Sequence, residues 1–162
     1  MDKKSRCYFD IETFGGLEIG PSMLITVCGI YYESGDIVQL VGDEINAGSL
    51  ERCFERCVVY TYNGSRFDIP VVKEKTGLDI CEVAPCRDLM YDCWKNGLYG
   101  GLKKVEKKLG IYRETAGVDG MEAMALWERY KAGSPEALRV LLKYNREDVV
   151  NLELLRKKLG VS

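Results

Sequence analysis

Short runs of β-branched and aromatic residues, separated by turn residues, dominate the first part of the chain. Such runs predict strands, and three of them follow one another without an intervening helical segment, at residues 6–13, 23–32 and 37–41. We therefore expect these three strands to form an antiparallel meander. Two further strands are predicted at residues 58–62 and 82–87.

Helical periodicity appears after the first three strands and dominates the chain from about residue 89. Helices are predicted at residues 49–57, 66–76, 89–95, 102–109, 121–131 and 135–159. Ser49 and the pair Ser134-Pro135 are typical of helix starts, and Gly77 is typical of a helix end. A meander followed by strand–helix units predicts an α/β fold in which a mixed five-stranded sheet is flanked by helices. We expect residues 1–162 to form one domain.

The composition is that of a globular domain, with 46% hydrophobic and 30% charged residues. No apolar run approaches the roughly 20 residues that cross a bilayer, and no signal peptide is recognisable, so we expect no membrane association and a cytoplasmic location. Seven cysteines, an odd number, exclude a complete set of intramolecular disulfides and favour reduced, buried thiols. The spacing of Cys81, Cys86 and Cys93 matches no common zinc motif, which leaves cysteine-bound zinc as a minor alternative.

The sequence contains no histidine. This absence excludes Ser-His-Asp and Cys-His catalysis and histidine-bound zinc, so any chemistry depends on carboxylates, tyrosines, lysines, cysteines or metals. Charge is uneven along the chain, since residues 1–80 hold 8 Lys and Arg against 13 Asp and Glu, whereas residues 81–162 hold 15 against 12. An acidic half beside a basic half suits a polyanionic substrate, and it equally suits helices whose Lys and Glu are simply solvated.

Asp10 and Glu12 are the candidate functional residues of the first strand. Successive side chains of a strand alternate between faces, so both carboxylates project from the same face. Two like charges held side by side cost free energy unless a proton or a cation neutralises them. Two interpretations follow from this pair alone: an edge strand with a solvated acidic face, or a site for a divalent metal.

Two further acids and a tyrosine follow later in the chain. Asp68 is predicted in the first turn of a helix that leaves a strand end, where it is either a functional acid or an ordinary partner of the helix dipole. Tyr144 and Asp148 are four residues apart in the last helix and therefore share one face. Because Val149, on a neighbouring position, packs inward, we expect Asp148 at the boundary of the core, as a functional acid or as a rim acid bound to the tyrosine.

Four carboxylates are hard oxygen ligands that suit Mg²⁺ or Mn²⁺. Two such ions about 4 Å apart stabilise both the attacking and the leaving oxygen of a displacement at phosphorus, and they remove the need for a histidine base. The sequence therefore indicates phosphodiester chemistry at a two-metal site.

Three segments resemble the motifs of the DEDD 3′–5′ exonucleases, which belong to the ribonuclease H-like superfamily. The segment DIE at residues 10–12 resembles the first motif, NGSRFD at residues 63–68 the second, and YNRED at residues 144–148 the third. The third motif is of the tyrosine type, as in polymerase proofreading domains. The order and spacing of the motifs match, and the resemblance covers nearly the whole chain.

The resemblance implies a ribonuclease H-like fold and a set of site residues. It implies that the four acids hold two metal ions and that Tyr144 orients the attacking water. The substrate-binding residues that it implies are Thr13, Phe14, Asn63, Phe67, Lys103 and Lys104, the last two in a segment that opens a helix or is simply a basic amphipathic helix. A histidine that precedes a mid-chain aspartate in some relatives is replaced here by Arg87, which puts a substrate role for Asp88 in doubt.

We therefore expect a 3′–5′ exonuclease that acts on single-stranded DNA or RNA in repair or processing. Alternatives are an endonuclease or resolvase of the same superfamily, and a catalytically idle domain that binds nucleic acid. The intact set of acids argues against the idle domain, because a pure binder would not need them. The sequence does not separate exonuclease from endonuclease, or DNA from RNA.

Overall fold

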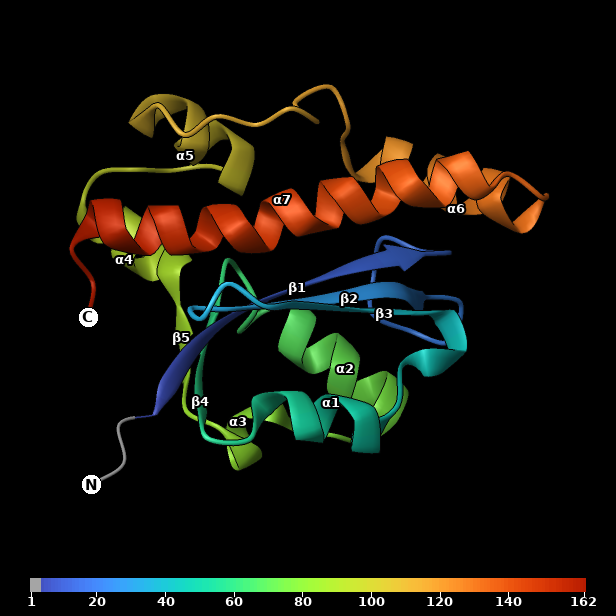
Figure 1. The fold of residues 1–162 in the computed structure, drawn as a ribbon, viewed down its shortest axis with the longest axis horizontal. Helices are drawn as coiled ribbons and strands as arrows, with labels where there is room; N and C mark the ends of the chain where they lie inside the picture. Colours follow the sequence, from blue (N-terminus) through green and yellow to red (C-terminus); the bar gives the residue numbers. More distant parts are fainter. Residues whose placement is uncertain (1–3) are drawn as a thin grey trace.

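The centre of the fold is a mixed sheet of five strands in the computed structural model, which describes residues 4–162 (Figure 1). The strands are β1 (Ser5–Phe14), β2 (Leu24–Tyr32), β3 (Ile37–Val41), β4 (Cys57–Thr61) and β5 (Cys86–Asp88). They lie in the order β3-β2-β1-β4-β5. The first three form an antiparallel meander, and β4 and β5 extend it in parallel with β1. The predicted mixed five-stranded sheet is confirmed.

Helices cover both faces of this sheet (Figure 1). They are a short 3₁₀ turn η1 (Gly42–Glu44) and the helices α1 (Ala47–Phe54), α2 (Asp68–Thr76), α3 (Ile80–Val83), α4 (Leu89–Lys95), α5 (Leu102–Leu109), α6 (Gly120–Lys131) and α7 (Pro135–Leu159). The predicted bounds of α4, α5 and α7 are confirmed, and Gly77 ends α2 in the left-handed conformation with φ 81°. Among residues 4–162, no helix combines the length and the apolar character needed to cross a membrane.

Two of the predicted elements were wrong in detail. Asn46, not Ser49, caps α1: the Asn46 side chain accepts a hydrogen bond from the Ser49 N–H, and the Ser49 hydroxyl accepts one from the Asn46 N–H. The strand predicted at residues 82–87 is reduced to β5, because α3 occupies its beginning. The Asp79 side chain caps α3 by accepting a hydrogen bond from the Cys81 N–H, a local signal that outweighs the β-branched residues nearby.

Alternation along β1 divides its side chains between the two layers of the protein. Cys7, Phe9 and Ile11 are buried in the core beneath α1, α2 and α3. Tyr8 points to the opposite face and joins a core with residues of α4, α5 and α7. Because the next even-numbered positions are Asp10 and Glu12, the period of two places both acids on the face that α7 covers.

Helix α7 lies lengthwise along that face (Figure 1). Toward its N-terminal end it packs with α6 in a second core, which includes Leu141 and Tyr144. Toward its C-terminal end, Val149 and the residues after it pack with Tyr8. Along α7, Asp148 lies between the residues of these two cores. Along β1, Asp10 and Glu12 likewise lie between them. The acids therefore meet at a gap between two apolar clusters on one side of the sheet.

Candidate metal centre

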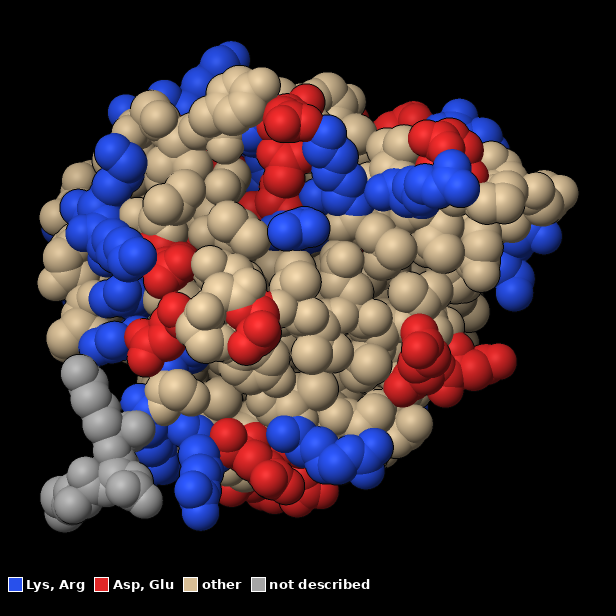
Figure 2. Space-filling view, in the orientation of Figure 1, with Lys and Arg blue, Asp and Glu red and all other residues tan. Residues whose placement is uncertain are grey.

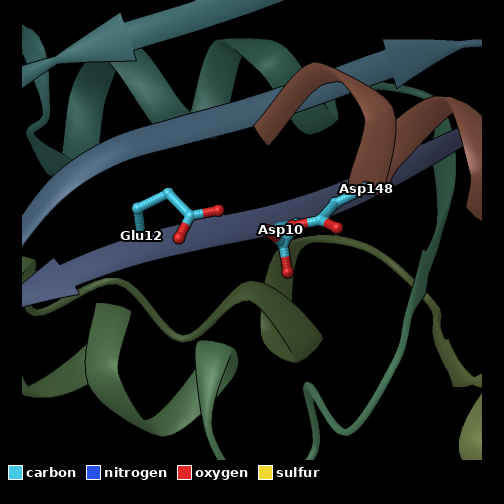
Figure 3. A group of neighbouring side chains, drawn as sticks. All are labelled: Asp10, Glu12 and Asp148. Carbon is cyan, nitrogen blue, oxygen red and sulfur yellow. The ribbon is translucent and has the colours of Figure 1, made fainter. Parts of the chain in front are cut away.

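Asp10, Glu12 and Asp148 form a compact group of carboxylates. One oxygen from each lies within 4.8 Å of the other two, a spacing at which a single cation contacts all three. Figure 3 shows the first two acids on β1 and Asp148 reaching toward them from α7. Among residues 4–162 this is the one group of three or more His, Cys, Asp or Glu side chains with such spacing, and no cysteine belongs to it.

The electrostatics of these carboxylates favour a cation. Glu12 and Asp148 are only 8% and 7% exposed, and the Glu12 Oε1 atom is buried without a hydrogen-bond partner among the described residues. Burial, together with the charges of the neighbouring acids, raises the pKa of Asp10 and of Glu12 well above the usual range. A buried acceptor without a donor and two carboxylates that resist ionisation both fit a site completed by a metal ion.

Asp68 lines the same pocket, whose volume is about 520 Å³, together with the other three acids. It is the first residue of α2, and its Oδ2 atom accepts a hydrogen bond of 3.0 Å from the Ile11 N–H. The pairing of β1 with β4 ends at Tyr8 and Tyr60, so the Ile11 N–H has no partner in β4 and can donate to Asp68. Burial raises the pKa of Asp68 to about 7, although the hydrogen bonds from backbone N–H groups act in the opposite direction. Asp68 lies outside the group of three carboxylates whose oxygens are within 4.8 Å of one another.

The turn before Asp68 brings Asn63 to the pocket. Asn63 has a φ of 60°, an unusual backbone conformation that asparagine tolerates better than most residues. Asp88 holds this turn, since its carboxylate accepts hydrogen bonds from the Asn63 N–H at 2.8 Å and from the Ser65 hydroxyl at 2.6 Å. It also accepts from the Met90 N–H and so caps α4. Asp88 therefore has a structural role at this turn.

Tyr144 also lines the pocket, one helical turn before Asp148. Burial and the nearby acids raise the pKa of its hydroxyl, which keeps it protonated at neutral pH. The Lys103 ammonium lies 4.7 Å from the centre of the Tyr144 ring, so α5 contributes a cation beside this residue. Burial lowers the pKa of Lys103.

Comparisons with known proteins agree with this fold. A family profile described as the RNase_H superfamily matches residues 7–160. The chain belongs to the RNase_H superfamily. No curated protein sequence matched the chain.

Two solved structures resemble this RNase_H superfamily chain in fold. A family B DNA polymerase from the hyperthermophilic archaeon Pyrobaculum calidifontis matches with a TM-score of 0.73 and 16% identity. The match covers 96% of this chain but only 24% of the polymerase. A structure described as the apo form of the nuclease matches with a TM-score of 0.65 and 23% identity, over 98% of this chain and 72% of that one.

Asn145 contacts the candidate metal centre, and no role was predicted for it from the sequence although it lies in the segment YNRED. Its Nδ2 atom donates to the backbone oxygen of Asp10 at 3.3 Å and to the Asp10 carboxylate at 3.4 Å. Gln39 donates to the Asn145 Oδ1 atom at 3.0 Å. A Cβ atom on Gly29 would lie 2.1 Å from that same oxygen, so only glycine leaves space for the amide. In the sequence, the one indication that Asn145 lies near the acids is its position next to Tyr144.

Arg113 is the second residue that was missed. It lies between α5 and α6, and its Nη2 atom donates to Asp148 at 2.6 Å and to Glu106 at 2.7 Å. The segment around Arg113 has no periodicity, so no sequence signal indicated that it reaches the acids.

Of the remaining predicted substrate residues, two lie at or next to the acid pocket and two do not. Phe67 lines both the acid pocket and an adjoining pocket of about 460 Å³, which Thr13 also lines. Phe14 is not brought to either pocket, because it packs against the core of α6 and α7 and lies beside Trp127. Lys104 is exposed and does not line the acid pocket.

Proposed function

We propose that this RNase_H superfamily domain is a divalent-metal-dependent 3′–5′ exonuclease of the DEDD tyrosine type, acting on single-stranded DNA or RNA. The observation that carries the proposal is the convergence of Asp10, Glu12 and Asp148 within 4.8 Å, in a pocket that Asp68 and Tyr144 also line. These residues come from three separate segments, in the order expected for that family. A binding domain without catalysis has no need for such a cluster of buried acids.

Mg²⁺ or Mn²⁺ fits the donor set, because both ions prefer carboxylate oxygens and Glu12 has an unpartnered oxygen. Asp10, Glu12 and Asp148 would hold one ion, and Asp68 in the same pocket would share in holding a second. Bound ions of this kind stabilise the attacking and leaving oxygens of an in-line displacement at phosphorus.

The protein's own residues supply orientation. The raised pKa of Tyr144 keeps its hydroxyl protonated at neutral pH, so no phenolate is present to act as a base, and we assign the hydroxyl to positioning the attacking water by a hydrogen bond. Asn145 and Arg113 keep Asp10 and Asp148 in place. Asn63, Phe67 and Thr13 line the space beside the acids, which suits contacts to the terminal nucleotide.

The charge distribution supports a polyanionic substrate. In the space-filling view, Lys and Arg gather along the side of the molecule where α5 and the C-terminal end of α7 lie (Figure 2). The exposed lysines of α5 and of the C-terminal end of α7 are Lys104, Lys107, Lys108, Lys157 and Lys158. Such a basic margin beside an acidic, metal-binding pocket attracts phosphates while the ions offset the acids.

The proposal is tested with 5′-labelled single strands of DNA and RNA, incubated with purified protein and Mn²⁺ or Mg²⁺. We expect a ladder of single-nucleotide steps, a slower start on a 3′-phosphorylated strand, and no attack on a circular single strand. The Asp10→Asn protein is the control for contaminating nucleases and should be inactive. Rapid nicking of the circle by the wild-type protein alone would favour the endonuclease, and no cleavage with either ion would favour the idle domain.

A further inference from the structure

An aromatic pair on α4 stands beside the candidate metal centre and has no part in its chemistry. Trp94 lines the pocket that contains the four acids and is partly exposed. Tyr91 packs edge-on against Trp94, with ring centres 5.1 Å apart, and is 39% exposed. The buried side of α4 is formed by other residues, among them Leu89 and Cys93. These two rings therefore form an aromatic surface at the pocket that the core does not use.

Arg66 adds a cation to this surface. Its guanidinium carbon lies 5.8 Å from the centre of the Trp94 ring, and Arg66 lines the same pocket. The side chain is exposed, and across residues 4–162 no carboxylate lies within ion-pair distance of it. By contrast, Arg113, the other arginine close to the acids, is buried between two carboxylates.

We propose that Trp94, Tyr91 and Arg66 form a binding subsite for one nucleotide of a single strand whose end lies at the acids. Trp94, with Tyr91 behind it, stacks on the base, and Arg66 contacts the adjoining phosphate. The identification of the strand rests on the proposed function, whereas the stacking surface is independent of cleavage. Every base has a π-face, so such a subsite selects unpaired nucleotides without selecting a sequence. A paired base is not available for this contact, which gives the site a preference for single strands over duplex ends.

Binding is measured in the Asp10→Asn background without added metal, using fluorescein-labelled dT₁₀ and U₁₀ so that the strand stays intact. Loss of one stacked base corresponds to about a 5- to 150-fold weaker Kd. We expect Trp94→Ala to weaken binding within that range and Trp94→Phe to recover most of it. Arg66→Gln should weaken binding and reduce the salt dependence of log K by about 0.7.

Trp127 provides a matched control, since the chain has only two tryptophans. Trp127 also packs against a tyrosine and has a lysine 5.8 Å from its ring centre, but it lies in the core of α6 and α7 and not at the acid pocket. Trp127→Phe should leave the affinity unchanged. It also leaves Trp94 as the single fluorescent tryptophan, whose emission should be quenched when dT₁₀ binds and much less by an abasic strand of the same length.

The outcomes separate this subsite from the proposed function. Unchanged affinity in a folded Trp94→Ala protein, equal quenching by the abasic strand, or no binding of either oligomer would overturn the subsite. If the wild type binds strands through Trp94 but never cleaves them, the exonuclease assignment fails and the subsite stands. If cleavage occurs and Trp94→Ala raises KM with little change in kcat, both are supported, because the stacking contact contributes equally to the ground and transition states.

Discussion

Arg113 donates a hydrogen bond of 2.6 Å from Nη2 to the Oδ1 atom of Asp148, and the same nitrogen donates to Glu106 at 2.7 Å. Asn151 in turn donates to the second oxygen of Glu106. Burial disfavours the charged guanidinium, but Glu106 and Asp148 outweigh it and raise the pKa of Arg113. Asp148 is thus already oriented by a cation, which it shares with Glu106, before any metal binds. Asp10 and Glu12 have no such cation among their described partners.

Removing Arg113 should therefore destabilise the protein and disturb the metal centre together. Arg113→Met leaves the buried Glu106 without its cation, and breaking a buried ion pair in this way costs about 3–5 kcal/mol. Urea unfolding in EDTA measures this change in the free energy of unfolding. We also expect a weaker apparent affinity for Mn²⁺, because Asp148 loses the hydrogen bond that orients it.

Arg139 is the matched control, because its ion pair with Glu136 lies on the surface with both side chains 71% exposed. Arg139→Met should change stability by no more than about 0.5 kcal/mol. The double variant Arg113→Met with Glu106→Gln should be less destabilised than the sum of the two single variants, since neither charge is then left alone. Additive effects would mean that Arg113 and Glu106 do not act as a pair.

Repulsion among the clustered carboxylates should destabilise the metal-free wild-type protein. A variant that lacks one of these carboxylates should therefore be more stable in EDTA. Asp10→Asn removes a partly buried acid whose pKa is raised by desolvation and by the neighbouring acids, so we expect a higher Tm in EDTA. A gain of 1 kcal/mol corresponds to ~2–4 °C for a chain of this size. The same variant should lose the rise in Tm that Mn²⁺ gives the wild type. Equal destabilisation with and without Mn²⁺ would instead make Asp10 a structural residue.

Stability in EDTA should fall as the pH rises. Burial raises the pKa of Asp68 from its ordinary 3.8 to about 7, so the folded state holds a proton that the unfolded chain releases. The resulting stabilisation is complete below pH ~3.8 and is lost as the pH increases to ~7, and Asp10 and Glu12 act in the same direction. Urea unfolding at pH 5 and pH 8 should show the higher free energy at pH 5. Asp68→Asn should reduce the difference, and a difference unaffected by this change would contradict the assignment.

The period-two pattern of β1 was sufficient to place Asp10 and Glu12 on one face, and helix spacing was sufficient to align Tyr144 with Asp148. Convergence of the two pairs depends on how α7 crosses the sheet, which periodicity does not encode. The resemblance to known motifs supplied that step. Phe14 illustrates the difference: alternation puts it on the same face as the acids, but α6 packs over that end of the strand, and Phe14 lies partly buried against the core of α6 and α7.

Glu106 and Arg113 could not be identified from local pattern. Glu106 lies in the Lys-rich helix α5, a composition typical of a solvated helix, yet it is 2% exposed. Its burial follows from a partner seven residues away in an irregular segment and from Asn151 on another helix. Long-range pairs of this kind become visible only when the three segments are seen packed together.

Tyr144→Phe tests whether the hydroxyl of this residue acts in the reaction. The raised pKa keeps the hydroxyl protonated at neutral pH, so it acts as a hydrogen-bond donor and acceptor and not as a base. Loss of a group that positions the attacking water should lower the single-turnover rate by about 10²–10⁴-fold. Because the ring remains, its contact with Lys103 and the apparent affinity for Mn²⁺ should hardly change.

Tyr130→Phe is the control for this substitution, since Tyr130 packs against Trp127 and lines a different pocket. It removes a hydroxyl of the same kind and should leave the rate unchanged. The rate of Tyr144→Phe should also keep the wild-type dependence on pH between 6 and 8, because a protonated hydroxyl does not titrate in that range. Full activity in Tyr144→Phe would refute the positioning role, and loss of a titration step in its pH profile would show that the tyrosine acts as a base after all.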